Sequence, residues 1–419
     1  MRMLWKNIKG LVGAYDQPPT HLSGKEMRNF AFMEDAWLAI EDGKVVDFGA
    51  MSEFPGIVDW SGLEVLDCSG RYVMPAWCDS HTHLVFAAPR GGEFLARLEG
   101  KSYQEIAAAG GGILNSAKAL QSMPEEQLLS DARERLKHVM KLGTGAIEIK
   151  SGYGLTSEAE LKMLRVIAAL KAEFDLPIRA TFLGCHAVPE GDWTSESWTE
   201  HVIKELLPKV AEANLADYVD AFCEEGYFSA DDVEAFLKAS NDLSIPGKVH
   251  VNQFNSIGGV KMGIENSVRS LDHLEELSVD DLEALALRSN SGGSPLFACA
   301  LPGCSYFLSI PYAPVRRLMD ANVPVALATD FNPGSAPSGN MGRVVQMGMV
   351  KMKMHPLEAI AAATINGAAA MGLADVAGTI GIGRSANLLL TKPMDGLETM
   401  GYAFGEESVE KVFIGGVQQ

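Results

Sequence analysis

The sequence predicts an α/β protein in which a (β/α)8 barrel of the TIM type is joined to a small β-sandwich domain built from both termini. Two observations predict this fold class. In the middle of the chain, strand-like apolar runs alternate with amphipathic helical segments. At both ends, short strands are separated by turn-rich sequence. We expect the barrel over residues 75–374 and the composite sandwich over residues 1–74 and 375–419.

The two ends of the chain share a pattern of short apolar strands separated by turns. WLAIEDGKVVDFGA is two apolar stretches joined by Glu-Asp-Gly-Lys, which predicts a hairpin. LEVLDCSGRYVMPAW adds two strands around a Ser-Gly turn. SANLLLTKP and VEKVFIGGVQQ repeat the pattern near the C-terminus. We therefore expect strands from both ends to form one unit.

The middle of the chain contains eight strand-like runs. Most are separated by helical segments such as SEAELKMLRVIAALKAEF, where apolar residues recur at helical spacing. This alternation is typical of a parallel barrel. The predicted strands are WCDSHTHLVF, TGAIEIKSG, IRATFLGCHA, YVDAFCEE, GKVHVNQF, RSLDHLE, SPLFACALPG and VPVALATDF.

The composition restricts the partners. A formal net charge of −19 disfavours phosphate backbones and anionic membranes, so we expect no nucleic-acid and no membrane partner. A small anionic substrate would then need a local cation. The six cysteines form no Cys-x-x-Cys pair, and no apolar run approaches the roughly 18 residues of a membrane span. With no secretory signal recognisable at the start, we expect a cytoplasmic protein.

Polar or ionisable side chains stand at the C-terminal end of most predicted strands. In a barrel these ends face one mouth, where active sites of this fold are built. His81 and His83 alternate on one strand and can reach the same metal ion, while His250 and Asp330 would complete a site of three nitrogens and one oxygen. Such a site suits zinc or ferrous iron and leaves a position for water. The strand-end residues are His81, His83, Lys150, His186, Glu224, His250, His273 and Asp330.

Each of these residues also has a purely structural interpretation. A His-x-His pair alone is a weak signal, His250 could be a core histidine, and Asp330 could cap the following helix. The metal site is favoured because four residues from separate places all fall at strand ends. Lys150 could be a carbamate that bridges two metals, but it follows the second strand rather than the fourth, so one metal ion is expected.

Other candidates are expected to be structural. A glycine run forms a turn more plausibly than a phosphate cradle, because neither a strand nor a Lys-Ser/Thr pair follows it. Four histidines in loops or charged helices are expected to be solvated. These residues are Gly110, Gly111 and Gly112, and His21, His138, His201 and His355.

With these residues in place, the chain resembles the amidohydrolase superfamily, whose barrels carry His-x-His on strand one, His on strands five and six, and Asp on strand eight. Within it, the segments EFLARLEGKSYQEIAAAGGGI, IEIKSGYGL, HAVP, FCEEGYFS and ATDFNPGS are similar to those of the imidazolonepropionases of histidine degradation. The resemblance runs from about residue 70 to the closing FGEESVEKVFIGG. It implies hydrolysis of the cyclic amide C–N bond of 4-imidazolone-5-propanoate to N-formimidoyl-L-glutamate, and a homodimer.

The resemblance also implies roles for individual residues. His273 and Asp330 would be catalytic, and Arg90 would supply the cation that holds the substrate's propionate, unless it only pairs with Glu93. The metal ligands would be His81, His83, His250 and Asp330. The substrate-binding residues would be Arg90, Tyr103 and Tyr153 for the propionate, His186, Gln253 and His273 around the ring, and Asn332, Gly334 and Ser335 for the ring or its opened product.

Two positions depart from the pattern of the relatives. Ala76 stands where the superfamily usually has glycine, which only adjusts a turn. Gln253 stands where some relatives carry glutamate, and an amide can position the ring but cannot act as a base.

Two other functions stay open. A different cyclic amide hydrolase or a deaminase could use this scaffold, although a neutral base offers Arg90 no carboxylate. A non-catalytic barrel used for binding is the third possibility, and a stable, metal-free protein would favour it.

Overall fold

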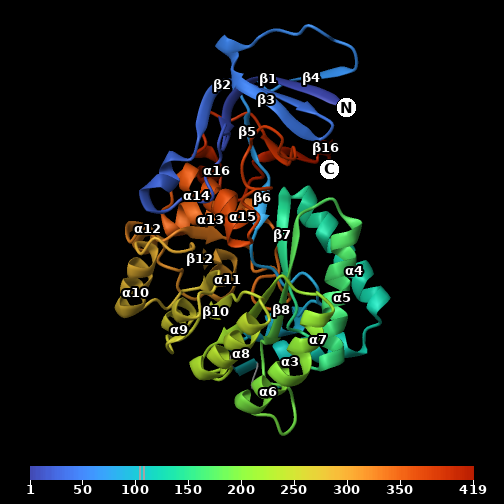
Figure 1. Cartoon of the computed structure of the whole chain (residues 1–419), viewed down its shortest axis with the longest axis vertical. Coiled ribbons are helices and arrows are strands. Elements are labelled where there is room, and N and C mark those ends of the chain that lie inside the picture. Colours follow the sequence, from blue (N-terminus) through green and yellow to red (C-terminus); the bar gives the residue numbers. More distant parts are fainter. Residues whose placement is uncertain (103–104, 107–108) are drawn as a thin grey trace.

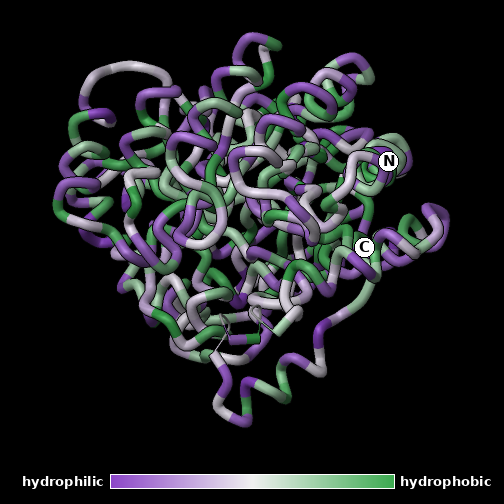
Figure 2. Tube along the Cα trace, turned by 90° about the horizontal axis from the view of Figure 1, so that it is seen from below, coloured by the Kyte–Doolittle hydropathy of each residue, from purple (hydrophilic) through white to green (hydrophobic). Residues whose placement is uncertain are grey.

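The computed structural model describes residues 1–102, 105–106 and 109–419, and its strands form two separate sheets. A parallel sheet makes the barrel, with helices around it, and a mixed sheet from both chain ends lies above it (Figure 1). Figure 2 views the molecule from below, with hydrophilic segments frequent along the outer turns of the tube. In the described part of the chain, no helix is both long and apolar enough to cross a membrane.

The mixed sheet combines N-terminal and C-terminal strands, as predicted. β14 pairs antiparallel with β5 and so joins the two ends of the chain, while β2 and β3 form the predicted hairpin. Trp5, Leu388 and Phe413 are buried in its shared apolar core. Its strands are β1 (Arg2–Val12), β2 (Phe32–Glu41), β3 (Lys44–Ala50), β4 (Leu63–Asp67), β5 (Tyr72–Pro75), β14 (Leu388–Thr391), β15 (Val409–Ile414) and β16 (Val417–Gln418). The domain boundaries at residues 74/75 and 374/375 stay a prediction.

The barrel strands are all parallel and follow one another in chain order, so the predicted fold class is confirmed. Each of the eight apolar runs contains one of these strands. Strands buried on both faces read as continuous apolar runs, which is why the sequence reveals them. They are β6 (Trp77–Asp79), β7 (Thr144–Lys150), β8 (Ile178–Cys185), β9 (Tyr218–Cys223), β10 (Val249–Val251), β11 (Ser270–His273), β12 (Phe297–Ala300) and β13 (Val325–Leu327).

The first and last barrel strands meet just beyond their ends. Thr82 forms an isolated parallel bridge with Phe331. The amide of Asp330 donates to the carbonyl of His81 at 3.0 Å, and the amide of His83 donates to the carbonyl of Phe331 at 2.9 Å. The barrel is therefore closed by the backbone of the segments that carry the predicted metal ligands.

Helices cover the outside of the barrel, and several begin at a side-chain cap. Thr156 accepts from the amide of Ala159 at the start of α5, and Ser229 and Asp232 form a capping box at the start of α8. The helices are α1 (Gly91–Leu98), α3 (Ile113–Ser122), α4 (Glu125–Lys141), α5 (Ser157–Glu173), α6 (Ser195–His201), α7 (Leu207–Glu212), α8 (Ala230–Asp242), α9 (Gly259–Glu265), α10 (Val279–Ser289), α11 (Pro302–Leu308), α12 (Val315–Asp320), α13 (Met341–Met352), α14 (Pro356–Ala363), α15 (Ile365–Ala370) and α16 (Thr399–Tyr402).

Three of the four histidines expected to be solvated are instead half-buried in structural roles. The ring of His21 packs edge-on against Phe297. His201 stacks on Trp198, and His355 caps the start of α14. The sequence prediction was wrong for these three because it treated loops and charged helices as uniformly exposed. His138 is exposed, as expected.

Candidate metal centre

Four of the predicted ligands come from three separate barrel strands and lie together in the interior. His81 and His83 follow β6, His250 lies in β10, and Asp330 follows β13. All four side chains are at most 4% exposed. Asp330 has a backbone φ of 54°, which is uncommon for a residue other than glycine and occurs often at functional sites.

The donor atoms of these residues have the spacing that a single ion requires. Nε2 of His83 lies 3.3 Å from Nε2 of His81 and 3.4 Å from Nε2 of His250. Oδ1 of Asp330 lies 3.4 Å from Nε2 of His81 and 3.4 Å from Nε2 of His83. Four donors placed tetrahedrally about 2.0–2.1 Å from one ion would be about 3.3–3.4 Å apart. These four distances and the donor types therefore fit a metal ion.

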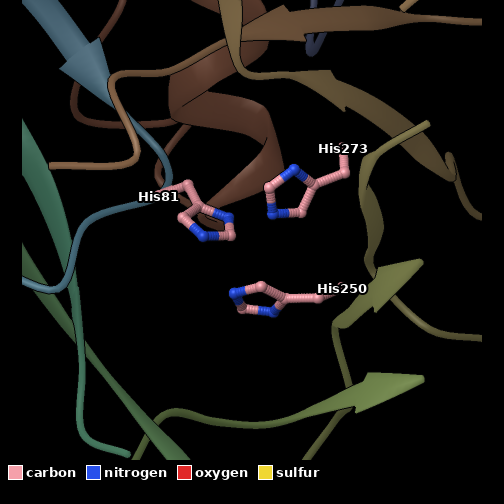
Figure 3. A group of neighbouring side chains, drawn as sticks. All are labelled: His81, His250 and His273. Atoms are coloured by element: carbon pink, nitrogen blue, oxygen red, sulfur yellow. The ribbon is translucent and has the colours of Figure 1, made fainter. Parts of the chain in front are cut away.

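A fifth side chain approaches the same point. Potential ligand atoms of His81, His250 and His273 all lie within 4.8 Å of one another. Figure 3 shows the three rings, carried by different segments, directed toward one another. His273 is thus close enough to act on anything bound at the centre.

Two buried aspartates orient two of the imidazoles. Nδ1 of His81 lies 2.6 Å from Oδ2 of Asp272, and Nδ1 of His250 lies 3.1 Å from Oδ1 of Asp220. A carboxylate that accepts the Nδ1–H leaves Nε2 with its lone pair free, which is the form that binds a metal.

Beneath the centre lies a fully buried network of charges. Nζ of Lys150 is 2.6 Å from Oε1 of Glu148 and 2.7 Å from Oδ2 of Asp220. Nζ of Lys248 contacts the other oxygen of Glu148. Burial lowers the pKa of Lys150, but Asp220 and Glu148 raise it more, so its pKa lies above the ordinary value. Its ammonium is therefore engaged as a counter-ion to these carboxylates.

The electrostatics favour neutral imidazoles at His83 and His250 beside a carboxylate at Asp330. At His81 burial lowers the pKa, but hydrogen bonds to Asp272 and Asp330 outweigh it and raise that pKa above its ordinary value. Burial lowers the pKa of His83, and burial together with His81 and Lys150 holds the pKa of His250 well below its ordinary value. Burial raises the pKa of Asp330, but hydrogen bonds from His81 and His83 outweigh it and hold that pKa well below its usual range. The states of His83, His250 and Asp330 are those that a cation needs.

A small cavity connects the centre to most of the predicted substrate-binding residues. Gln253 donates from Nε2 to Sγ of Cys304 at 3.2 Å. Asn332 holds its own loop together, since its Oδ1 accepts from the amides of Gly334 and Ser335 at 2.8 and 2.7 Å. The cavity is lined by His83, Ile113, Tyr153, His186, Phe222, His250, Gln253, His273, Asp330, Asn332 and Ser335.

His186 lies flat against His83 with one nitrogen committed to the backbone. The ring centroids are 5.3 Å apart with an interplanar angle of 14°, and Nδ1 of His186 lies 2.8 Å from the carbonyl oxygen of Gly152. Burial and the neighbouring His83 lower the pKa of His186 to about 3. A neutral ring that donates from Nδ1 presents Nε2 to the cavity as an acceptor.

Arg90 does not line this cavity itself, and with Gly334 it lines another one. Its Nε donates to Oγ of Ser116 at 2.8 Å, and its guanidinium lies 5.5 Å from the ring centroid of Tyr153. The alternative pairing with Glu93 exists only as a 3.8 Å contact. Tyr103, the third residue predicted to hold the propionate, lies outside the described residues.

Sequence reasoning missed the residues that support the site. Asp220 and Asp272 orient ligands, while Glu148 and Lys248 complete the buried network. A signal did exist, because each is a charged residue inside an apolar strand segment. Only the three-dimensional pairing shows what each one contacts.

The family is shown by comparison with known proteins. Residues 72–418 match the model of the amidohydrolase family. The chain belongs to the amidohydrolase family. Within this family it is 51% identical to an imidazolonepropionase of Christiangramia forsetii and 49% identical to one of Flavobacterium johnsoniae. Each alignment covers 99% of this chain and 99% of the relative, so this amidohydrolase belongs with the imidazolonepropionases.

The amidohydrolase fold is also found among solved structures. An adenosine deaminase from Xanthomonas campestris with bound zinc matches with a TM-score of 0.67 and 15% identity. The match covers 99% of this chain and 92% of that one. At this identity the likeness concerns the fold alone.

Proposed function

We propose that the chain hydrolyses the cyclic amide C–N bond of 4-imidazolone-5-propanoate and releases N-formimidoyl-L-glutamate. The observation that carries the reaction class is the cluster of three imidazoles and one carboxylate, in which four donor–donor distances are 3.3–3.4 Å. The substrate is supported by full-length similarity to relatives named imidazolonepropionase.

We propose one metal ion, zinc or iron, held by His81, His83, His250 and Asp330. The donor set of three nitrogens and one oxygen suits either metal. When bound there, such an ion lowers the pKa of a coordinated water from about 15.7 towards about 7.

The residues around the ring would then move protons. In the balanced reaction, the hydroxyl of water adds to the ring carbonyl carbon, the C–N bond breaks, and the proton passes to the leaving nitrogen. Asp330 is placed to accept the proton of water, and His273 to stabilise the developing oxyanion or protonate the nitrogen. Gln253 can donate and accept hydrogen bonds but cannot act as a base.

The remaining side chains would select the substrate. Arg90 offers a planar guanidinium for the propionate, with Tyr153 beside it. Nε2 of His186 is an acceptor suited to a ring N–H. Asn332, Gly334 and Ser335 would line the other side of the ring, in the loop that follows Asp330.

The decisive experiment is a ring-opening assay on imidazolone propionate with and without a metal chelator, beside a panel of purines and pyrimidines. We expect chelator-sensitive ring opening and no deamination. Turnover of a neutral base instead of the acid would favour a deaminase, and a stable, metal-free, inactive protein would favour a binding barrel. We also propose that the protein is a cytoplasmic homodimer. Sedimentation of the purified protein would test the oligomeric state.

His273 separates catalysis from metal binding. We expect His273→Ala to lower turnover by about 100-fold or more while its metal content stays at the wild-type level, because loss of an acid–base group costs about that much. Metal analysis and kinetics on the same preparation measure both. If the variant loses its metal, His273 is a ligand and the proposed ligand set is wrong.

A further inference from the structure

The turn that ends β11 brings a second carboxylate against the imidazole of His273. His273 has a φ of 85° and Leu274 a φ of 67°, so two successive residues other than glycine occupy the left-handed region. The amide of Leu274 donates to the carbonyl of Val251, and the amide of Glu276 to that of Asn252, at 3.1 and 2.8 Å. The neighbouring strand thus holds an unfavourable backbone in place, which is common where a side chain must be directed.

The result of this turn is a close pair of His273 and Glu275. Nδ1 of His273 lies 3.4 Å from Oε1 and 3.3 Å from Oε2 of Glu275, and both side chains are at most 2% exposed. Hydrogen bonds of catalytic groups are often long in the absence of substrate. The hydrogen bond is to Oε1, and Oε2 lies within reach of the same nitrogen.

Glu275 has few other partners. Ser305 donates from Oγ to Oε1 of Glu275 at 3.1 Å. Within the described part of the chain, Oε2 has no hydrogen-bond partner, although Nδ1 of His273 lies 3.3 Å away. A buried carboxylate oxygen without a donor is costly, so the N–H of His273 is the group that can satisfy it.

We propose that Glu275 is the positioning residue for His273, because it accepts the Nδ1–H and so directs Nε2 to the substrate. Figure 3 shows the other side of the His273 ring facing His81 and His250. The role follows from the chemistry of imidazole, in which the hydrogen bond at one nitrogen decides the state of the other. Nε2 of His273, which carries no proton in this state, would take up the proton that Asp330 accepts from water and pass it to the leaving nitrogen, while Glu275 holds the ring through Nδ1. Gln253 cannot replace it, because an amide cannot act as a base.

The first test is spectroscopic and does not depend on activity. In the zinc-loaded protein labelled with 15N-histidine, we expect the His273 signals to show a proton on Nδ1 and none on Nε2. The signals are assigned by their loss in His273→Asn. In Glu275→Ala the proton should move to Nε2 or be shared. An unchanged tautomer in Glu275→Ala overturns the proposal.

The second test is kinetic and rests on the proposed ring opening. We expect Glu275→Ala to lower kcat by about 10- to 100-fold with KM changed less than about twofold, as for other residues that orient a functional histidine. Glu275→Gln should recover part of kcat, because its amide oxygen still accepts the N–H. Glu276→Ala is the matched control, since Glu276 is the exposed neighbour of the same type.

The remaining outcomes are also decisive. If Glu275→Ala does not fold, Glu275→Gln and its tautomer carry the test. Loss of zinc from either variant would overturn the proposal, because it would make the group of His273, Glu275 and Cys304 a metal site. If the wild-type protein shows the Nδ1–H tautomer but opens no imidazolone ring, the proposed substrate fails while the placement of His273 stands.

Discussion

Arg90 is the residue on which recognition of an acidic substrate depends. Replacing it with Met should raise KM for imidazolone propionate by about 10- to 100-fold with a smaller effect on kcat, because a charged hydrogen bond to carboxylate contributes about 1.5–3 kcal/mol. Steady-state kinetics measure this. Equal losses in kcat and kcat/KM would instead mean that Arg90 acts only in the transition state.

A substitution at Gly334 tests independently whether the position of the Arg90 guanidinium matters for substrate binding. A Cβ at this position would overlap the guanidinium of Arg90. Gly334→Ala should therefore raise KM in the same direction while the charge remains. Gly92→Ala is a suitable control, because a Cβ there meets nothing within 4 Å and Gly92, like Gly334, does not have a positive φ.

At the scale of single elements, β11 serves two functions through neighbouring residues. Asp272 orients the ligand His81, and the next residue, His273, reaches the cavity. We expect Asp272→Asn to weaken zinc affinity by about 10- to 100-fold, since a neutral amide oxygen accepts the Nδ1–H of His81 more weakly than a carboxylate does. Competition with a zinc chelator measures the affinity, and Asp280→Asn, at an exposed position of α10, is the control.

The sequence predicted the elements better than their interactions. All eight barrel strands were recognisable because strands buried on both faces are continuous apolar runs. The predicted metal ligands stood out because they end such runs. The pairing of Asp220 with His250, and of Glu275 with His273, could not be predicted, since one depends on the closed barrel and the other on a left-handed turn at His273 and Leu274.

At the scale of the whole molecule, stability should fall in mild acid. His186 has a pKa of about 3 in the folded chain against about 6.5 when unfolded. Below pH 6.5 the imidazole of His186 binds a proton in the unfolded chain but not in the folded chain. The free energy of unfolding therefore falls as the pH falls from 6.5 towards 3. At pH 5 the resulting loss in the free energy of unfolding is about 2 kcal/mol.

Urea unfolding at pH 8 and pH 5 tests this. We expect His186→Gln to reduce the difference in the free energy of unfolding between the two pH values. His138→Gln, at an exposed position, should leave the difference unchanged. The same difference in His186→Gln as in the wild type would show that His186 is protonated in the folded chain.

The closure of the barrel has a consequence for how the apoprotein behaves. Backbone hydrogen bonds join the first barrel strand to the last at the segments of His81, His83 and Asp330, and we call this junction the seam. Because these residues stand on both sides of the seam, a bound ion would link its two sides. Ligand binding to the folded state raises its stability by about 4 kcal/mol at a thousandfold excess over Kd. Chelation should therefore lower Tm, and hydrogen exchange at the amides of His83 and Asp330 should accelerate before that of the other barrel strands. Uniform acceleration around the barrel would show that the seam opens only with global unfolding.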